Sequence, residues 1–302
     1  MDHWVGMYTR NASQKTMVEI AAIAPNITGI QKRYRWNELF DATNTLDLSE
    51  VQSDAVVCAT LGLKFNVMIE DKTFDGSNPV PQHLKRYAVR THQGYTAQRW
   101  HPAVEEAFLR TIMPIHRMAD VHSVSLQETA LGIKDADLDA RGYTPERYAD
   151  LYIHIVRALE TNAPDKPVLW YYNYMARDRD MVQAERVLTV MLNKGNGQLG
   201  GADILPNNWT LRNGPYTLYP TWKSQGMTTF CTASKESYAQ KSQYGYLTPE
   251  QILTYGKQAL KLSSIIWMYL KSPAEEGSYD FFDALPAMTS QTKNEPLPED
   301  FL

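Results

Sequence analysis

The spacing of apolar positions along this chain changes repeatedly between a period of two and a helical period. Residues 121–128 (VHSVSLQE) alternate from one position to the next, which is typical of a strand. Residues 102–118 instead place apolar side chains at helical spacing, which predicts an amphipathic helix. By the same criteria we expect eight strands, at residues 4–8, 27–36, 63–69, 121–128, 168–174, 198–205, 227–233 and 264–270.

Segments with helical spacing separate most of these strands. Thr144-Pro145 and Thr248-Pro249 each place a capping residue before a proline, an arrangement common at the first turn of a helix. We therefore expect helices over residues 15–23, 51–61, 102–118, 144–159, 181–193 and 248–262. Strands that alternate with helices predict a parallel sheet whose strands are joined by helical crossovers.

Eight such units within 302 residues fit an α/β fold, the closed (β/α)8 TIM barrel, with long loops at its carboxyl-terminal face. One of these loops, residues 73–100, lacks periodicity and is rich in ring side chains. No linker and no shift in composition divides the chain, so we expect one domain over residues 1–302. An open, doubly wound sheet is the alternative, but GGAD at residues 200–203 lacks the spacing of the glycine-rich phosphate turn.

Composition limits the classes of function. Hydrophobic residues make up 43% of the chain, charged residues 21%, and the net charge is −4 with acids and bases mixed. We therefore expect neither a nucleic-acid partner nor a membrane, because there is no basic stripe and no run of about 18 apolar residues. No Cys or His spacing indicates a metal or a cofactor. The amino terminus lacks a secretion pattern, yet a secreted or virion-associated protein is favoured over a cytoplasmic one.

Chemistry in such a barrel is expected where the strands reach their carboxyl ends. Glu128 is the leading candidate, because it ends a strand between Gln127 and Thr129 and lies outside any run of exposed charges. The strand ends also supply cations, acids, amides and aromatic rings, namely Arg33, Arg35, Trp36, Glu70, Lys72, Gln127, Tyr172, Asn173, Asp203, Glu236 and Trp267. Carboxylates for proton exchange, amides and arginines for hydroxyl groups, and flat rings for the apolar sugar face together indicate a carbohydrate ligand.

Some of these side chains have a simpler structural explanation. Trp36 and Trp267 could pack in the barrel wall instead of covering a sugar. Arg33 and Arg35 are two positions apart and face the same side of their strand, where one of them could form only a salt bridge.

The chain also resembles a known family. The resemblance extends over residues 27–285 and rests on the segments GIQKRYRWNEL, VMIEDKTF, SLQETALGI, WYYNYM and GGADILPNN. Together they resemble a family of bacterial and phage TIM-barrel glycoside hydrolases, which is similar to the retaining β-glycosidases of clan A. The resemblance implies that Glu128 is the acid/base, at the end of strand four, and that Glu236 is the nucleophile, after strand seven. Clan A usually has Asn directly before the acid/base, whereas this chain has Gln127.

The resulting hypothesis is an endo-acting, retaining glycoside hydrolase that cleaves an oligo- or polysaccharide without a cofactor. Retention requires the two carboxyl groups to lie about 5–5.5 Å apart, and a wider gap would mean inversion. Glu128 would have to stay protonated near neutral pH, which calls for partial burial or a neighbouring carboxylate. If Glu236 is a surface residue instead, Asp203 or Glu70 would oppose Glu128.

Two other functions fit the same residues. A non-catalytic barrel that binds carbohydrate would need the aromatic and amide side chains but no catalytic pair. A polysaccharide lyase would use Arg33, Arg35 and Lys72 to neutralise uronate carboxylates. Lys72 could equally pair with Glu70 and Asp71 beside it.

Overall fold

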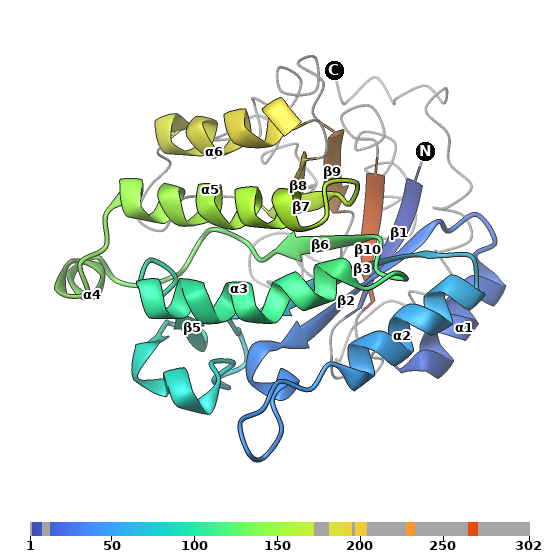
Figure 1. The fold of residues 1–302 in the computed structure, drawn as a ribbon, viewed down its shortest axis with the longest axis horizontal. Helices are drawn as coiled ribbons and strands as arrows, with labels where there is room; N and C mark the ends of the chain where they lie inside the picture. Colours follow the sequence, from blue (N-terminus) through green and yellow to red (C-terminus); the bar gives the residue numbers. More distant parts are fainter. Residues whose placement is uncertain are drawn as a thin grey trace, which may run out of the picture.

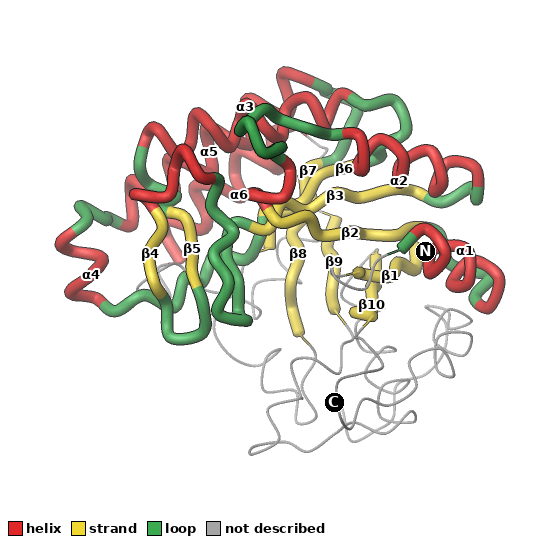
Figure 2. The backbone as a smooth tube through the Cα atoms, turned by 90° about the horizontal axis from the view of Figure 1, so that it is seen from below, coloured by secondary structure: helices red, strands yellow, loops and turns green. Residues whose placement is uncertain are grey.

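A computed structural model of the chain describes residues 2–7, 13–171, 181–194, 197–203, 228–232 and 265–270. Their architecture is a parallel sheet with α-helices along its outer side (Figure 1, Figure 2). The strands of this sheet are β1 (Asp2–Met7), β2 (Gly29–Arg35), β3 (Lys64–Glu70), β6 (Ser123–Leu126), β7 (Val168–Tyr171), β8 (Gly197–Asp203), β9 (Thr228–Thr232) and β10 (Ile265–Leu270).

Every pair of neighbouring strands in this sheet is parallel, in the order β1-β10-β9-β8-β7-β6-β3-β2. β1 pairs with β10 on one side, where Trp4 is in register with Trp267, and with β2 on the other, where Trp4 is in register with Gly29. The ring of strands therefore closes. All eight strands that the sequence predicts are present, although β6 stops at Leu126, so that Glu128 follows the strand and is not part of it.

Five helices cross between consecutive strands in the described part of the chain. They are α1 (Gln14–Ile23), α2 (Ser49–Thr60), α3 (Pro102–Arg117), α5 (Pro145–Asn162) and α6 (Met181–Lys194). Thr144 caps α5 as predicted, since its hydroxyl accepts from the Arg147 backbone N–H at 3.2 Å ahead of Pro145. α3, α5 and α6 lie side by side (Figure 1). The helix expected over residues 248–262 lies outside the described residues.

The loops after β2, β3 and β6 contain short elements that the sequence pattern does not predict. Residues 73–100 hold a 3-10 helix, η3 (Gln82–Tyr87), and an antiparallel hairpin of β4 (Ala88–Arg90) and β5 (Tyr95–Ala97). Gly94 permits the close approach of this hairpin, because a Cβ there would lie 2.5 Å from the Thr73 carbonyl oxygen. A 3-10 helix, η2 (Trp36–Leu39), follows β2, and a short helix, α4 (Asp135–Ala140), lies between β6 and α5.

Alternation along β2 divides the sheet into an outer and an inner face. Lys32 points outward to α2, where its Nζ donates to Asp54 Oδ2 at 2.5 Å. Gln31 points inward and donates to Asn66 of β3 at 2.7 Å and to Ser125 of β6 at 3.0 Å. The apolar core thus lies between sheet and helices, whereas the inner face of β2, β3 and β6 carries hydrogen-bonded polar side chains.

His116 makes the fold sensitive to acid. Its side chain is fully buried in α3, and burial lowers its pKa to about 4 from a usual value of 6.5. Between these values the unfolded chain binds a proton that the folded protein does not, so stability falls as the pH falls, by up to about 3 kcal/mol. We expect His116→Gln to flatten this part of the pH profile of urea unfolding. An unchanged slope would contradict the assignment.

Candidate active site at the carboxyl ends of the strands

The carboxyl end of β3 places Glu70, Asp71 and Lys72 in consecutive buried positions. Glu70 is in register with Arg35 of β2, and the distance from Arg35 Nε to Glu70 Oε2 is 3.5 Å. Burial raises the pKa of Glu70, against the opposing effect of Arg33 and Arg35. The two arginines therefore flank an acid and partly balance its charge.

Arg99, which no sequence pattern singles out, joins β3 to α5. Its Nε and Nη2 donate to the two carboxylate oxygens of Asp71 at 2.7 and 2.6 Å, and its Nη1 donates to the hydroxyls of Tyr152 at 2.9 Å and Tyr148 at 3.1 Å. Burial opposes the charge of Arg99, but Asp71, Tyr148 and Tyr152 together more than offset it, so the pKa of Arg99 lies above its usual value. The buried, permanently charged guanidinium thus links the carboxyl end of β3 to α5.

The backbone that follows β6 is fixed by three side chains from three different segments. Consecutive carbonyl oxygens each accept one hydrogen bond: Glu128 O from Arg99 Nη1 at 2.7 Å, Thr129 O from the Tyr148 hydroxyl at 2.8 Å, and Ala130 O from Lys72 Nζ at 2.5 Å. This anchoring holds Glu128 in one position at the end of the strand, which is the preorganisation that a catalytic side chain requires.

The Glu128 carboxyl group lies next to a lysine ammonium, which in turn lies over an aromatic ring. Its Oε1 is 3.3 Å from Lys72 Nζ, and its side chain is 27% exposed, so one part of it faces solvent. Lys72 Nζ lies 4.4 Å from the centre of the Phe74 ring, which is 41% exposed. A solvent-accessible carboxylate, an ammonium and an open ring next to one another match the groups that hold a sugar.

The amide of Gln127 has a structural task instead of the predicted substrate contact. Its Oε1 accepts from the backbone N–H groups of Asp71 at 3.0 Å and Lys72 at 2.9 Å, and its Nε2 donates to Lys72 O at 2.9 Å. The side chain is buried, and both of its polar atoms are engaged. Gln127 thus ties the end of β6 to the end of β3.

Trp36 does not lie at the mouth of the sheet, which corrects the expectation that it covers a sugar. It is fully buried, its Nε1 donates to Thr111 Oγ1 of α3 at 2.9 Å, and its ring meets Phe108 edge-on. The reason is its position: Trp36 continues the outward-facing series of Lys32 and Tyr34 on β2. The alternative explanation, packing in the barrel wall, is the correct one.

For several predicted site residues, the structure does not describe the side chain. Glu236, Tyr172 and Asn173 lie outside the described residues. Asp203 is the last residue of β8, so its backbone is at the expected strand end, and Trp267 is inside β10, in register with Thr232 of β9. Their roles in catalysis and substrate binding stay predictions.

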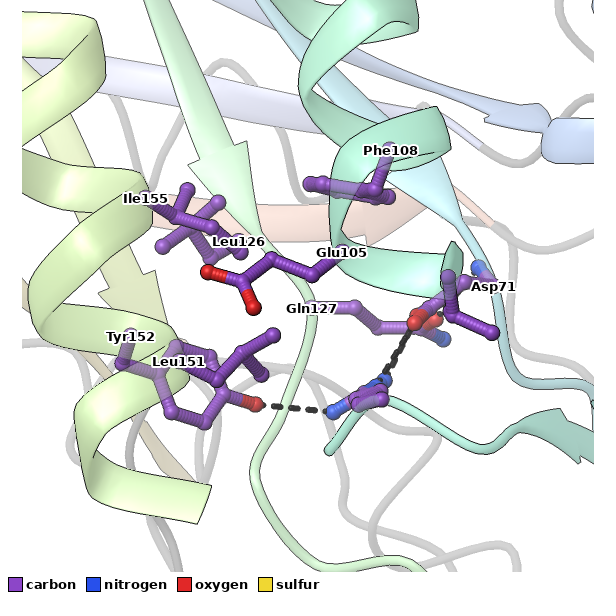
Figure 3. A pocket seen from close by; sticks show the side chains of 10 residues that line it. Asp71, Glu105, Phe108, Leu126, Gln127, Leu151, Tyr152 and Ile155 are labelled. Atoms are coloured by element: carbon purple, nitrogen blue, oxygen red, sulfur yellow. Dashed lines mark hydrogen bonds and ion pairs between the residues drawn. The ribbon is translucent and has the colours of Figure 1, made fainter. Parts of the chain in front are cut away.

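A small cavity lies behind the Asp71–Arg99 pair, between β6, α3 and α5 (Figure 3). Glu105, Leu126, Gln127 and Tyr152 are among the residues around it, and the Glu105 carboxyl group points into it. It encloses about 20 Å³, which is room for a single water molecule and far too little for a sugar. This cavity is therefore too small to be a carbohydrate site.

Two kinds of feature are missing from the part of the chain that the structure describes. No three His, Cys, Asp or Glu side chains come together there as a metal site would need. No helix among those residues is long and apolar enough to cross a bilayer.

Comparison with known proteins identifies relatives by fold alone. No family model matches the chain, and no curated protein matches its sequence. Three solved structures are similar in fold, and each is 10% identical to the chain. A β-galactosidase from the psychrophilic Marinomonas ef1 has a TM-score of 0.61, and the match covers 89% of this chain and 54% of the galactosidase. For an endoxylanase retrieved from a sugarcane soil metagenome the TM-score is 0.54 and the coverages are 93% and 89%; for an α-galactosidase from Lactobacillus brevis they are 0.52, 95% and 39%.

The likeness is to the parallel strand and helix framework of TIM-barrel glycosidases. The chain spans about half the length of the β-galactosidase and less of the α-galactosidase. The bacterial and phage family that the sequence resembles is not itself matched. The fold relationship is therefore distant, and any activity must be argued from the site.

Proposed function

We propose that this chain is a glycoside hydrolase built on a (β/α)8 barrel, endo-acting and retaining, in which Glu128 is one of the two catalytic carboxylates. The observation that carries the proposal is the placement of Glu128: a part-exposed acid at the carboxyl end of a strand, with its backbone anchored by Arg99 and its side chain beside Lys72. The closed ring of parallel strands supports the barrel, and the distant fold likeness to glycosidases supports the reaction class.

The second carboxylate in this proposal is Glu236. It follows β9, the seventh strand of the ring by sequence, whereas Glu128 follows β6, the fourth. Acids after these two strands can face each other across the mouth of a barrel, as the resemblance to clan A implies. Asp203 at the end of β8 and Glu70 at the end of β3 are the alternatives.

The substrate that we propose is an oligo- or polysaccharide, bound without a cofactor on the open side of Glu128. Phe74 is well situated to stack on a sugar ring there, because it is exposed and touches the Lys72 ammonium. We also propose that the protein works in a secreted or virion-associated setting as a single domain. A lyase is less well supported, because Arg35 and Lys72, two of the cations it would use, already contact Glu70 and Glu128.

The experiment that tests the function is a glycan panel with product analysis. We expect xylan, galactan or α- or β-linked galacto-oligosaccharides to include a substrate, and NMR to show that the first-formed product keeps the anomeric configuration. Calorimetric binding without cleavage would favour the non-catalytic barrel, and an unsaturated product that absorbs in the ultraviolet would favour the lyase. If the protein neither binds nor cleaves any member of the panel, the proposal is contradicted.

A further inference from the structure

The contact between Lys72 and Glu128 gives the candidate catalytic carboxyl group a preferred charge. Lys72 Nζ is 3.3 Å from Glu128 Oε1, and the Lys72 side chain is only 5% exposed. Burial lowers the pKa of Lys72, and Glu128 is the strongest influence in the opposite direction. A buried ammonium at this distance favours the ionised carboxylate, just as the carboxylate favours the ammonium.

Other groups near Glu128 in the described part of the chain do not cancel the effect of Lys72, which favours the ionised form of Glu128. They include Arg99, which contacts the Glu128 backbone, and the three partners of Arg99, which are Asp71, Tyr148 and Tyr152. Arg99 donates to the backbone oxygen of Glu128, and its charge is matched by the bidentate carboxylate of Asp71. Burial raises the pKa of both tyrosines, so they remain neutral. Among these described groups, Lys72 is the cation that directly contacts the Glu128 carboxyl group.

We propose that Lys72 keeps Glu128 ionised through neutral pH, so that Glu128 enters the reaction as a carboxylate and not as the proton donor. This inference rests on the proposed glycoside hydrolysis. A Glu128 oxygen would bond to the anomeric carbon as the bond from that carbon to the leaving oxygen breaks, and the leaving oxygen would take a proton from the opposing acid. Water would then return a proton to that acid while its oxygen bonds to the anomeric carbon and the ester bond to Glu128 breaks.

This assignment reverses the roles that the family resemblance implies. A proton donor must hold its proton near neutral pH, which a neighbouring carboxylate or an apolar pocket achieves. A lysine 3.3 Å away, as Glu128 has, acts in the opposite direction. The donor would then be the opposing acid, which is Glu236 or one of its alternatives, Asp203 and Glu70. Burial raises the pKa of Glu70, which is the direction that a donor needs.

The charge state is tested by 13C NMR of the 302-residue chain labelled at the glutamate carboxyl carbons, with the Glu128 signal assigned from its loss in Glu128→Gln. We expect Lys72→Met to raise the titration midpoint of Glu128 by about one pH unit or more, and Lys72→Arg to preserve most of the wild-type behaviour. Arg110→Met, which removes the cation of an exposed pair on α3, should leave the signal unchanged. Lys72→Gln replaces the Met variant if that variant does not fold. A midpoint that does not move overturns the proposal.

The chemical role is tested with 2,4-dinitrophenyl β-xyloside and β-galactoside, whose leaving group departs without a proton. On such substrates a variant of the proton donor keeps most of its rate for the first step, whereas a variant of the attacking carboxylate loses it. We expect Glu128→Gln to lose the burst of dinitrophenolate that the first step releases, and a retained burst would overturn the role. If the wild type cleaves neither these substrates nor any glycan, the proposed function fails, while the NMR titration still decides whether Lys72 sets the charge of Glu128.

Discussion

Replacement of Glu128 by glutamine is expected to lower kcat/KM by about 10³-fold or more on any glycan that the wild type cleaves. Glutamine keeps the size of the side chain and can still contact Lys72, but it can neither ionise nor transfer a proton. Binding should survive, because the anchoring of the Glu128 backbone by Arg99 does not depend on the carboxyl group. Initial rates and calorimetric affinity, measured on both proteins, separate the two effects.

The matched control for this variant is Glu106→Gln. Glu106 is a largely exposed residue of α3 whose partner is Arg110, one helical turn away, so the same change removes a charge far less buried than that of Glu128. We expect its turnover to equal that of the wild type. Full activity in Glu128→Gln would remove the basis of the proposed hydrolase, and equal losses in the two variants would point to a general effect of charge.

The sheet could be predicted from the sequence because each strand has a readable apolar pattern between turn residues. The hairpin within residues 73–100 could not, because strands of three residues are too short for a period to emerge. Its turn also lacks the Asn-Gly or Asp-Gly pair that usually marks a hairpin; instead Thr91 Oγ1 accepts from the Gly94 N–H at 2.9 Å. Tertiary contacts, such as that of Gly94 with Thr73, select this conformation.

The candidate site could be predicted only where strand geometry determines it. Alternation along β2 puts Arg33 and Arg35 on the inner face, and the same alternation would have assigned Trp36 to the outer face, where the structure has it. Arg99 gives no such signal, because it lies in an aperiodic loop 28 positions from Asp71 and 49 from Tyr148. Only the folded chain brings these groups together, so their interaction cannot be read from local spacing.

Replacement of Arg99 by methionine is expected to destabilise the protein by about 3–5 kcal/mol. The variant leaves the Asp71 carboxylate buried without its bidentate partner and removes the hydrogen bonds to Glu128 O, Tyr148 and Tyr152. Methionine fills much of the same volume, so the loss reports the charge and the hydrogen bonds more than a cavity. Urea unfolding followed by circular dichroism measures the change.

Arg110→Met is the control for this experiment, because it removes an arginine whose ion pair is exposed, and such pairs contribute about 0–1 kcal/mol. Asp71→Asn in the Arg99→Met background should recover part of the lost stability, since the buried charge that has no partner is then neutral. A loss in Arg99→Met no larger than in Arg110→Met would mean that Arg99 does not hold the end of β3 against α5. The anchoring of the segment after β6 would then have to come from other contacts, among them those of Tyr148 and Lys72.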